Sequence, residues 1–245
     1  MKDNMKTDRV DRSVWDRDAR ETLRRRPLVH TEILDQIVAR RPSRGLVLEI
    51  GAQRGVDAAA LVDLGYRVVA LDYSDESIAM MRSRYRGKLL IVKGDARHLP
   101  FRDRRFSLVY SQGLLEHYFE PDLGRIMLEQ RRVIRDDGLV LVDVPNLFSP
   151  LTIPKHILMA LKLYVLPQEW QYSWRALRRL GQRYGLAYVH HYTWGYDRLV
   201  ARPIIRVLES LPFGLGRVTE RMHKWAEKEF GDYLLKCVGV FFRKV

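Results

Sequence analysis

Short apolar runs alternate with amphipathic stretches between Gly45 and Val144. The runs are rich in Val, Ile and Leu and hold few charges, which is typical of strands that helices bury on both faces. They predict strands at Leu46–Ile50, Arg67–Leu71, Leu89–Lys93, Phe106–Ser111 and Gly138–Val144. The stretches between them predict helices near Val56–Leu64, Asp75–Arg84 and Leu123–Ile134. Gly65 is placed to end the first helix and Ser74 to cap the second, so the pattern predicts a doubly wound α/β sheet.

Weaker patterns flank this central region. Pro27–Arg40 has helical spacing of its apolar residues Leu28, Ile33, Leu34, Ile37 and Val38, and predicts a helix that packs on the sheet edge or covers the site. Downstream, the patterns predict a helix at Ser173–Tyr184 and strands at Leu186–Tyr192 and Tyr233–Phe242. We expect one domain over residues 1–245, with a basic helical lead-in (1–44), a core (45–146) and a region of insertions and last strands (147–245).

Two stretches, Leu147–Trp170 and Arg198–Asp232, exceed what a minimal fold of this kind needs. Leu147–Leu166 is apolar, but its prolines, lysines and histidine exclude a membrane-spanning helix, which needs about 20 predominantly apolar residues. Its portion Ile157–Val165 is interpreted as a lid helix over the substrate site. The alternative is a peripheral helix at a membrane surface, with Lys155 and Lys162 near lipid phosphates.

The cysteine content and the first residues of the chain indicate the cellular compartment. The 245 residues contain one cysteine, Cys237, so an intrachain disulfide and a thiolate zinc site are excluded, and a reducing, cytoplasmic setting is expected. Met1–Arg26 is rich in charge and lacks the apolar core of a secretory signal.

The net charge of +13 is unevenly distributed. Residues 1–45 hold 12 basic and 8 acidic side chains, residues 46–146 hold 15 of each, and residues 147–245 hold 16 and 7. The neutral core is therefore flanked by basic segments, which suggests an anionic partner such as a phosphorylated substrate, a membrane surface or a nucleic acid. Charge that serves solubility alone is the alternative.

A glycine turn follows the first predicted strand, in Glu49-Ile50-Gly51-Ala52-Gln53-Arg54-Gly55. Such a turn lets the backbone approach a ligand, and the following helix offers unpaired N–H groups. About 20 residues later the second strand ends in Asp72, a carboxylate suited to accept hydrogen bonds from ribose hydroxyls. The pair indicates a nucleoside-containing cofactor and is compatible with both NAD and S-adenosylmethionine. NAD is disfavoured because Gln53 and Val56 stand where a dinucleotide fingerprint has glycine.

Two further segments contain motifs by which the sequence resembles a known family. Lys93-Gly94-Asp95-Ala96-Arg97-His98-Leu99-Pro100-Phe101 follows the third strand, and the fourth continues into Ser111-Gln112-Gly113-Leu114-Leu115-Glu116-His117. With these motifs the sequence resembles the class I S-adenosylmethionine-dependent methyltransferases, in the small-molecule branch of type 11 that includes quinone-biosynthesis enzymes. The resemblance covers about residues 44–146 well and implies a Rossmann-like, seven-stranded, mostly parallel sheet with an antiparallel last strand and a helical lid.

The resemblance implies a role for each motif residue. Glu49 would lie near the methionine part of the cofactor, and Asp72 would hold the ribose. Tyr73 would lie against the adenine ring. Asp95 would accept a hydrogen bond from the adenine amino group, and the backbone N–H of Ala96 would donate one to the adenine. The turn residues Gly51, Ala52 and Gly55 would form the floor, and the residues leaving the fourth strand, Ser111, Gln112 and Gly113, would face the sulfonium and the methyl acceptor. Gln53 stands where the family usually has glycine, and either crowds the aminocarboxypropyl group or supplies a polar contact to it.

His117 is the candidate base, because it titrates near neutrality and follows the fourth strand. Its alternative role is to brace the following loop. By the same resemblance Gly113 stands where quinone-biosynthesis relatives can have an acidic metal-binding residue, so no metal is expected. His190, His191 and Tyr192 end a predicted strand and are further candidates to reach an acceptor, though alternation lets only some of them do so.

Aromatic and arginine side chains gather in the carboxyl-terminal third: Trp170, Tyr172, Trp174, Tyr188, Tyr192, Trp194 and Tyr196 beside Arg175, Arg178, Arg179, Arg183 and Arg198. Such a combination suits a flat or anionic acceptor. The favoured hypothesis is methyl transfer from S-adenosylmethionine to a small-molecule acceptor or to a lipid-linked or glycan-linked one. The basic flanks would then contact the acceptor or a membrane surface. The alternatives are RNA methylation, disfavoured because no RNA-binding module is present, and a cofactor-binding protein that has lost catalysis.

Overall fold

The computed structural model describes residues 12–23, 29–40, 42, 45–149, 169–195 and 235–245. Its central feature is a seven-stranded sheet in the order β3-β2-β1-β4-β5-β7-β6. The strands are β1 (Leu46–Ile50), β2 (Arg67–Asp72), β3 (Leu90–Lys93), β4 (Phe106–Gln112), β5 (Ile134–Pro145), β6 (Leu186–Trp194) and β7 (Cys237–Lys244). Strands β1 to β5 are parallel to one another, and β7 runs antiparallel to both of its neighbours. The predicted doubly wound fold with an antiparallel last strand is therefore confirmed.

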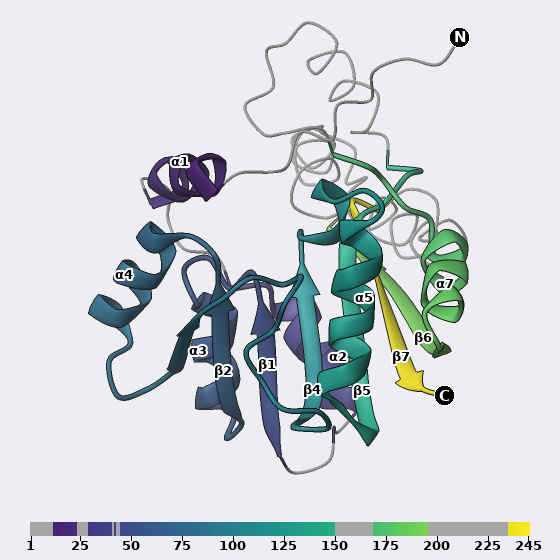
Figure 1. Cartoon of the computed structure of the whole chain (residues 1–245), viewed down its shortest axis with the longest axis horizontal. Helices are drawn as coiled ribbons and strands as arrows, with labels where there is room; N and C mark the ends of the chain where they lie inside the picture. Colours follow the sequence, from purple (N-terminus) through teal and green to yellow (C-terminus); the bar gives the residue numbers. More distant parts are fainter. Residues whose placement is uncertain (1–11, 24–28, 41, 43–44, 150–168, 196–234) are drawn as a thin grey trace, which may run out of the picture.

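Helices cover both faces of the sheet (Figure 1). The described helices are α1 (Arg12–Leu23), α2 (Thr31–Arg40), α3 (Val56–Asp63), α4 (Asp75–Arg84), the short 3-10 helix η1 (Leu115–His117), α5 (Asp122–Val133) and α7 (Trp174–Arg183). Buried side chains of α2, α3 and α4 pack with one face of the sheet, and those of α5 and α7 pack with the other. Each face thus has its own apolar core, as the near-continuous apolar strands predict.

Local sequence explains most of the element boundaries. The Oγ of Ser74 accepts a hydrogen bond from the backbone N–H of Ser77 at 3.2 Å, which caps α4 as predicted. Gly65 has a φ of +89° just after α3, a conformation that costs glycine little. The predicted bounds are reproduced for β1 and α4, and the other core elements differ by only a few residues at their ends.

Three boundary predictions are wrong. The helix predicted from Pro27 begins at Thr31, and its Val38 is 41% exposed instead of buried. Ile134, predicted in a helix, opens β5 because it pairs with Phe106 of β4 before a bulge in that strand pair. The strand predicted from Tyr233 begins at Cys237 and continues to Lys244. The predicted helix Ile157–Val165 and the stretch Arg198–Asp232 lie outside the described residues.

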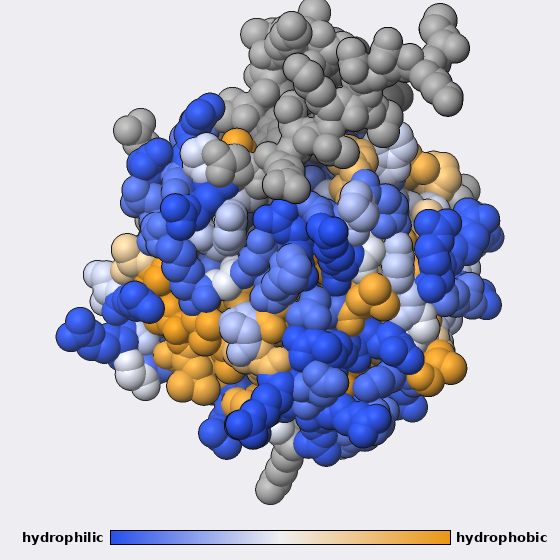
Figure 2. Space-filling model, viewed as in Figure 1, coloured by the Kyte–Doolittle hydropathy of each residue, from blue (hydrophilic) through white to orange (hydrophobic). Residues whose placement is uncertain are grey.

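The expectation that every core strand is buried on both faces is also wrong for β3. Its first and last residues are exposed, and Leu90 is 52% exposed. The chain from residue 94 to residue 105, which leads to β4, contains no helix that could cover this end of the sheet. Figure 2 shows the resulting apolar surface over β2 and β3, beside a largely hydrophilic exterior.

Candidate functional site

The turn after β1 is held in a left-handed backbone conformation at three positions. Gly51, Gln53 and Gly55 have φ values of +74°, +45° and +65°. The N–H groups of Gly51 and Ala52 both donate to the carbonyl of Leu71, at 2.9 and 3.0 Å, which ties the turn to the end of β2. Gln53 therefore adopts a conformation that costs a residue with a Cβ about 1–2 kcal/mol, which explains why glycine suits this position.

Asp72, the last residue of β2, joins the turn through its side chain. One carboxylate oxygen accepts the backbone N–H of Gln53 at 2.7 Å, and the other accepts the N–H of Ser74 at 2.8 Å. The side chain is buried, which raises the pKa of Asp72, and the backbone hydrogen bonds oppose this shift. Because each carboxylate oxygen can accept a second hydrogen bond, Asp72 retains capacity for a ligand.

A pocket opens at this end of the sheet, next to the turn and the carboxyl end of β2. Its outline, with the open mouth included, takes in about 520 Å³. Its lining residues are Trp15, Asp18, Ala19, Ile50, Gly51, Gln53, Leu71, Asp72, Tyr73, Ser74, Ser77, Gly94, Ala96, Gly113, Leu114 and Tyr118. Ligands of open α/β sheets bind at this edge.

Six of the predicted cofactor-binding residues are among the lining residues: Gly51, Gln53, Asp72, Tyr73, Ala96 and Gly113. The other six lie beside the pocket or behind its wall: Glu49, Ala52, Gly55, Asp95, Ser111 and Gln112. The structure thus brings the strand ends and the glycine turn together, and the individual roles stay predictions.

Helix α1 supplies one wall of this pocket, which the sequence did not predict. Trp15, Asp18 and Ala19 belong to the lining, and the Trp15 ring meets His117 edge-on with their centroids 5.0 Å apart. The only signal was the four-residue spacing of Trp15 and Ala19, which places both on one helix face within a strongly charged segment. Figure 1 shows α1 next to α4 and clear of the sheet.

Polar contacts fasten α1 to the start of α4. Asp16 accepts from the Ser74 hydroxyl at 2.5 Å, Arg12 pairs with Asp75 at 3.2 Å, and Arg20 pairs with Glu76 at 2.9 Å. The side chains of both ion pairs are 40–59% exposed, so each pair contributes little, about 0–1 kcal/mol.

Replacing Ser74 by alanine removes both the α4 cap and the hydrogen bond to Asp16. We expect the free energy of unfolding to fall by about 1–2 kcal/mol in a urea titration. Ser83→Ala, at an exposed position in the same helix, is the matched control and should change it by less than about 0.5 kcal/mol. Equal effects of the two substitutions would contradict the capping role.

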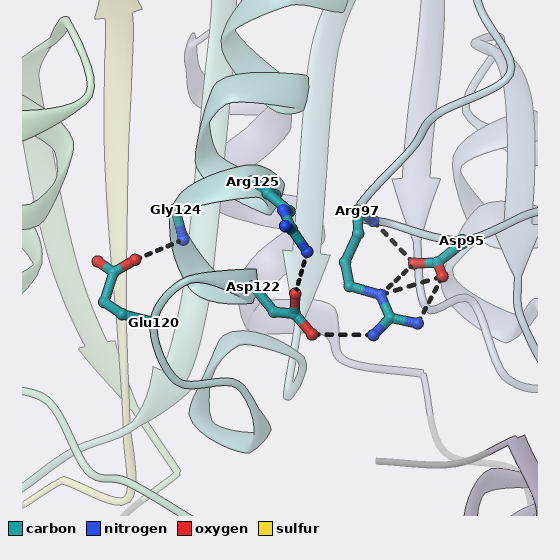
Figure 3. A network of polar contacts seen from close by, with 6 residues as sticks. All are labelled: Asp95, Arg97, Glu120, Asp122, Gly124 and Arg125. Carbon is teal, nitrogen blue, oxygen red and sulfur yellow. Dashed lines mark hydrogen bonds and ion pairs between the residues drawn. The ribbon is translucent and has the colours of Figure 1, made fainter. Parts of the chain in front are cut away.

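The predicted adenine contact, Asp95, is already occupied by a neighbour. Arg97 donates to both carboxylate oxygens of Asp95, at 2.7 to 3.0 Å, and also to Asp122 at 2.9 Å (Figure 3). Burial alone would raise the pKa of Asp95, but the hydrogen bonds and charge of Arg97 together lower it. With the backbone N–H of Arg97 as a further donor at 2.9 Å, Asp95 has little accepting capacity left for a ligand.

Glu49 lies on the opposite face of β1 from its neighbour Ile50, which lines the pocket. Burial raises the pKa of Glu49 well above its ordinary value, and Asp57 of α3 adds to the shift, while Tyr110 of β4 opposes it. One carboxyl oxygen, Oε2, is buried with no hydrogen-bond partner in the described part of the chain.

The residues after β4 differ in their surroundings. Ser111 is buried, and its Oγ has no hydrogen-bond partner among the described residues. Gly113 has a φ of +61° and donates its N–H to the carbonyl of Asp143 in β5 at 2.9 Å. His117 is only 4% exposed and does not line the pocket, so the structure places the predicted base behind Trp15.

The aromatic and arginine concentration divides into separate groups. His191 stacks on Trp174 at a centroid distance of 4.3 Å, while Arg178 lies over the Tyr188 ring at 5.3 Å, so these side chains cover α7 and β6. Trp170 is 55% exposed. His190, His191 and Tyr192 lie within β6, because the strand continues beyond its predicted end to Trp194. Tyr196 and Arg198 lie outside the described residues.

Asp143, near the end of β5, is a buried carboxylate that the sequence did not single out. Its Oδ2 accepts both the Tyr192 hydroxyl and the Trp194 indole N–H at 2.9 Å. Tyr192 crosses β7 to reach it, which is possible because the intervening residue, Gly239, has no side chain. Burial raises the pKa of Asp143 to about 6, and the hydrogen bonds from Trp194 and Tyr192 oppose this rise.

This raised pKa predicts a pH dependence of stability. Asp143 holds its proton to higher pH in the folded chain than its ordinary pKa of 3.8 allows in the unfolded chain. Its contribution to the free energy of unfolding should therefore fall as the pH rises from about 4 to about 6, by on the order of 2–3 kcal/mol. Urea titrations of the wild type and Asp143→Asn over this window should show a fall that is larger by this amount in the wild type, and parallel pH profiles would refute it.

Within the described chain no group of three His, Cys, Asp or Glu side chains is arranged to hold a metal ion. None of the described helices has the length and apolar character to cross a membrane.

Comparisons with known proteins bear on the central part of the chain. Residues 48–142 match the family described as "Methyltransferase domain". Over 121 residues the chain is 34% identical to a probable S-adenosylmethionine-dependent methyltransferase of Mycolicibacterium smegmatis, and the match covers 49% of this chain and 46% of that protein. Over 98 residues it is 33% identical to a demethylmenaquinone methyltransferase of Clavibacter sepedonicus, covering 39% of each. The chain thus spans about half the length of the curated relatives it matches, or less.

The fold has solved counterparts. One is the 1,6-didemethyltoxoflavin-N1-methyltransferase of Burkholderia thailandensis, solved with its substrate and S-adenosylhomocysteine bound. It aligns with a TM-score of 0.64 over 96% of this chain and 87% of its own, at 16% identity. At that identity the likeness concerns the fold alone.

Proposed function

We propose that the chain is a class I S-adenosylmethionine-dependent methyltransferase, which transfers a methyl group from S-adenosylmethionine to a small-molecule or lipid-linked acceptor. The observation that carries the proposal is the pocket at the ends of β1 and β2, where a left-handed glycine turn faces the buried carboxylate of Asp72.

The residues of this pocket fit the cofactor chemically. The free accepting capacity of Asp72 suits a pair of ribose hydroxyls. The pocket also has apolar lining against which a nucleoside can pack, namely Ile50, Leu71 and Leu114. When bound, the cofactor supplies an activated methyl group on a sulfonium, so the protein has only to align the acceptor and exclude water.

The surface beside the site supports an apolar or lipid-linked acceptor. Phe119, Leu147, Phe148 and Trp170 are all 39–55% exposed. The Phe119 and Trp170 rings meet edge-on with their centroids 6.1 Å apart. The backbone N–H of Trp170 donates to the carbonyl of Glu116 at 2.8 Å, and the backbone N–H of Leu147 donates to the carbonyl of Tyr172 at 3.0 Å. Exposed large apolar side chains that lie next to one another mark binding surfaces more often than isolated ones do.

Calorimetric titration with S-adenosylmethionine, S-adenosylhomocysteine and NAD tests the cofactor. We expect the first two to bind at micromolar concentration or below and NAD not to bind, whereas no binding to a folded sample would refute the function. Transfer of a labelled methyl group from S-adenosylmethionine is then followed in cell extracts separated into lipid, small-molecule and RNA fractions. Label in the RNA fraction alone would favour the RNA alternative, and binding without any transfer would favour the inactive one.

A further inference from the structure

A second group of polar side chains lies on the face of the sheet that carries α2 and α3, at the edge where β5 and β6 end. We call it the His30 cluster, and it consists of His30, Asp57, Asp143, Tyr192 and Trp194. None of these residues lines the pocket described above, and the cofactor contacts proposed so far use none of them.

Two hydrogen bonds to the carboxylate of Asp57 fix His30. The imidazole Nδ1 lies 2.7 Å from Asp57 Oδ2, and the backbone N–H of His30 donates to Asp57 Oδ1 at 2.8 Å. The Asp57 side chain is 7% exposed and the His30 side chain 27%. Because an ionised carboxylate only accepts, the neutral imidazole carries its proton on Nδ1 and presents a lone pair at Nε2. This is the arrangement in which a carboxylate orients a histidine base.

An aromatic side chain fixes the other side of the imidazole. The Trp194 ring meets His30 edge-on at a centroid distance of 5.5 Å. Its indole N–H is bonded to Asp143 at 2.9 Å, so the ring cannot turn without breaking a buried hydrogen bond. Asp143 Oδ1 has no hydrogen-bond partner among the described residues. The imidazole therefore lies between a carboxylate and a fixed aromatic edge, with limited freedom to rotate.

Backbone connections place the cluster beside the cofactor pocket. Asp57 is the second residue of α3, which begins directly after the turn whose Gly51 and Gln53 line the pocket. At the other end, Gly113 lines the pocket and donates its N–H to the carbonyl of Asp143 at 2.9 Å. Both ends of the cluster are thus attached to the pocket wall.

We propose that His30, oriented by Asp57, receives the proton from the methyl acceptor, and that the acceptor is therefore a hydroxyl or an N–H nitrogen. This inference rests on the proposed function. In the step, a lone pair of the acceptor forms a bond to the methyl carbon while the carbon–sulfur bond breaks and its electron pair stays on sulfur. The acceptor's proton passes to Nε2 of His30 and then to water. His117, which is 4% exposed behind Trp15, has less access to an acceptor.

Four titratable groups lie in the His30 cluster or directly beside it. Asp57 of α3 contacts the imidazole directly, and Asp143 of β5 interacts with it electrostatically. Glu49 of β1 interacts with Asp57, and Lys236, just before β7, interacts with Asp143. Three of the four surrounding groups are therefore carboxyls, and one is cationic.

The test needs no knowledge of the acceptor, because S-adenosylmethionine and S-adenosylhomocysteine differ by one positive charge at sulfur. The imidazole of His30 is titrated by NMR in full-length protein with ¹⁵N-labelled histidine, saturated with either ligand. We expect the midpoint of the His30 titration to lie about two pH units lower with S-adenosylmethionine. That shift corresponds to unit charges roughly 6 Å apart at an effective dielectric constant of ~20, and direct proton transfer from the acceptor requires such a separation.

Two variants and one reference make the result decisive. His30→Gln assigns the signal and should retain binding of S-adenosylhomocysteine. In Asp57→Asn the ¹⁵N shifts should show the preference for the Nδ1–H tautomer weakened. His190, about 13 Å along β6 from Trp194, is the internal reference and should shift much less.

The outcomes separate the two proposals. If both ligands bind and the His30 midpoint is the same in the two complexes, this inference is wrong while the proposed function stands. A larger shift at His117 than at His30 would also overturn it and return the role to His117. If neither ligand binds a folded sample, the proposed function fails and the inference fails with it.

Discussion

Replacing Asp72 by asparagine is expected to weaken binding of S-adenosylmethionine by about 10- to 150-fold, as hydrogen bonds to a charged group are worth about 1.5–3 kcal/mol. Asp72 lines the pocket, and its side chain accepts hydrogen bonds from the backbone of two other lining residues, Gln53 and Ser74. Asparagine keeps one accepting oxygen but turns an amide donor toward one of these N–H groups. Calorimetric titration of the two proteins measures the loss.

The control for this prediction is Asp63→Asn. Asp63 is a 69% exposed carboxylate at the end of α3, paired with Lys88, and it does not line the pocket. We expect unchanged affinity in this variant and an unchanged far-UV spectrum in both. If Asp72→Asn bound the cofactor as tightly as the wild type, the cofactor site would have to be sought elsewhere.

The second large effect is expected from Gly239→Ala, at the third residue of β7. A Cβ atom on Gly239 would lie 2.3 Å from two ring carbons of Tyr192 and 2.5 Å from its hydroxyl oxygen. The ring would have to leave its place over β7, which also breaks its hydrogen bond to the buried Asp143. Overpacking and the lost buried hydrogen bond together should lower the free energy of unfolding by on the order of 2–5 kcal/mol, measured by urea titration.

A double-mutant cycle isolates this clash. In a Tyr192→Ala background the ring is absent, so Gly239→Ala should cost far less than in the wild type. The same penalty in both backgrounds would show that backbone conformation, and not Tyr192, requires the glycine.

Much of the fold could be predicted because its signals are local. The spacing of apolar residues predicted β1 and α4 with their observed bounds, and the identity of Ser74 alone predicted the cap of α4. Helix α1 could not be predicted in this way. Its apolar signal consists mainly of Trp15 and Ala19 among charged residues, and its place depends on contacts with α4, some 60 residues away in sequence.

The same difference between local and long-range signals decides which parts of the candidate site could be predicted. The glycine turn and Asp72 follow directly from strand ends, so their approach was predictable from topology. The pairing of His30 with Asp57, 27 residues apart, was not predictable, because neither residue lies in a motif that carried the resemblance. For Asp95 the reverse holds. Its motif was recognised, but hydrogen bonds from Arg97 occupy its carboxylate and reduce its capacity to accept from a ligand.

Asn146, the residue after β5, contacts the chain next to two long connecting segments, residues 150–168 and residues 196–234. Its backbone N–H donates to the carbonyl of Lys236 at 2.9 Å, its side-chain amide donates to Leu235 at 3.0 Å, and it forms a bridge with Tyr172. It thereby fixes where the chain leaves the sheet before residues 150–168 and where it returns after residues 196–234. Exchanging or lengthening these two segments is consequently expected to leave the cofactor half of the sheet undisturbed. Engineered exchanges of either segment should therefore join the chain at these same boundaries.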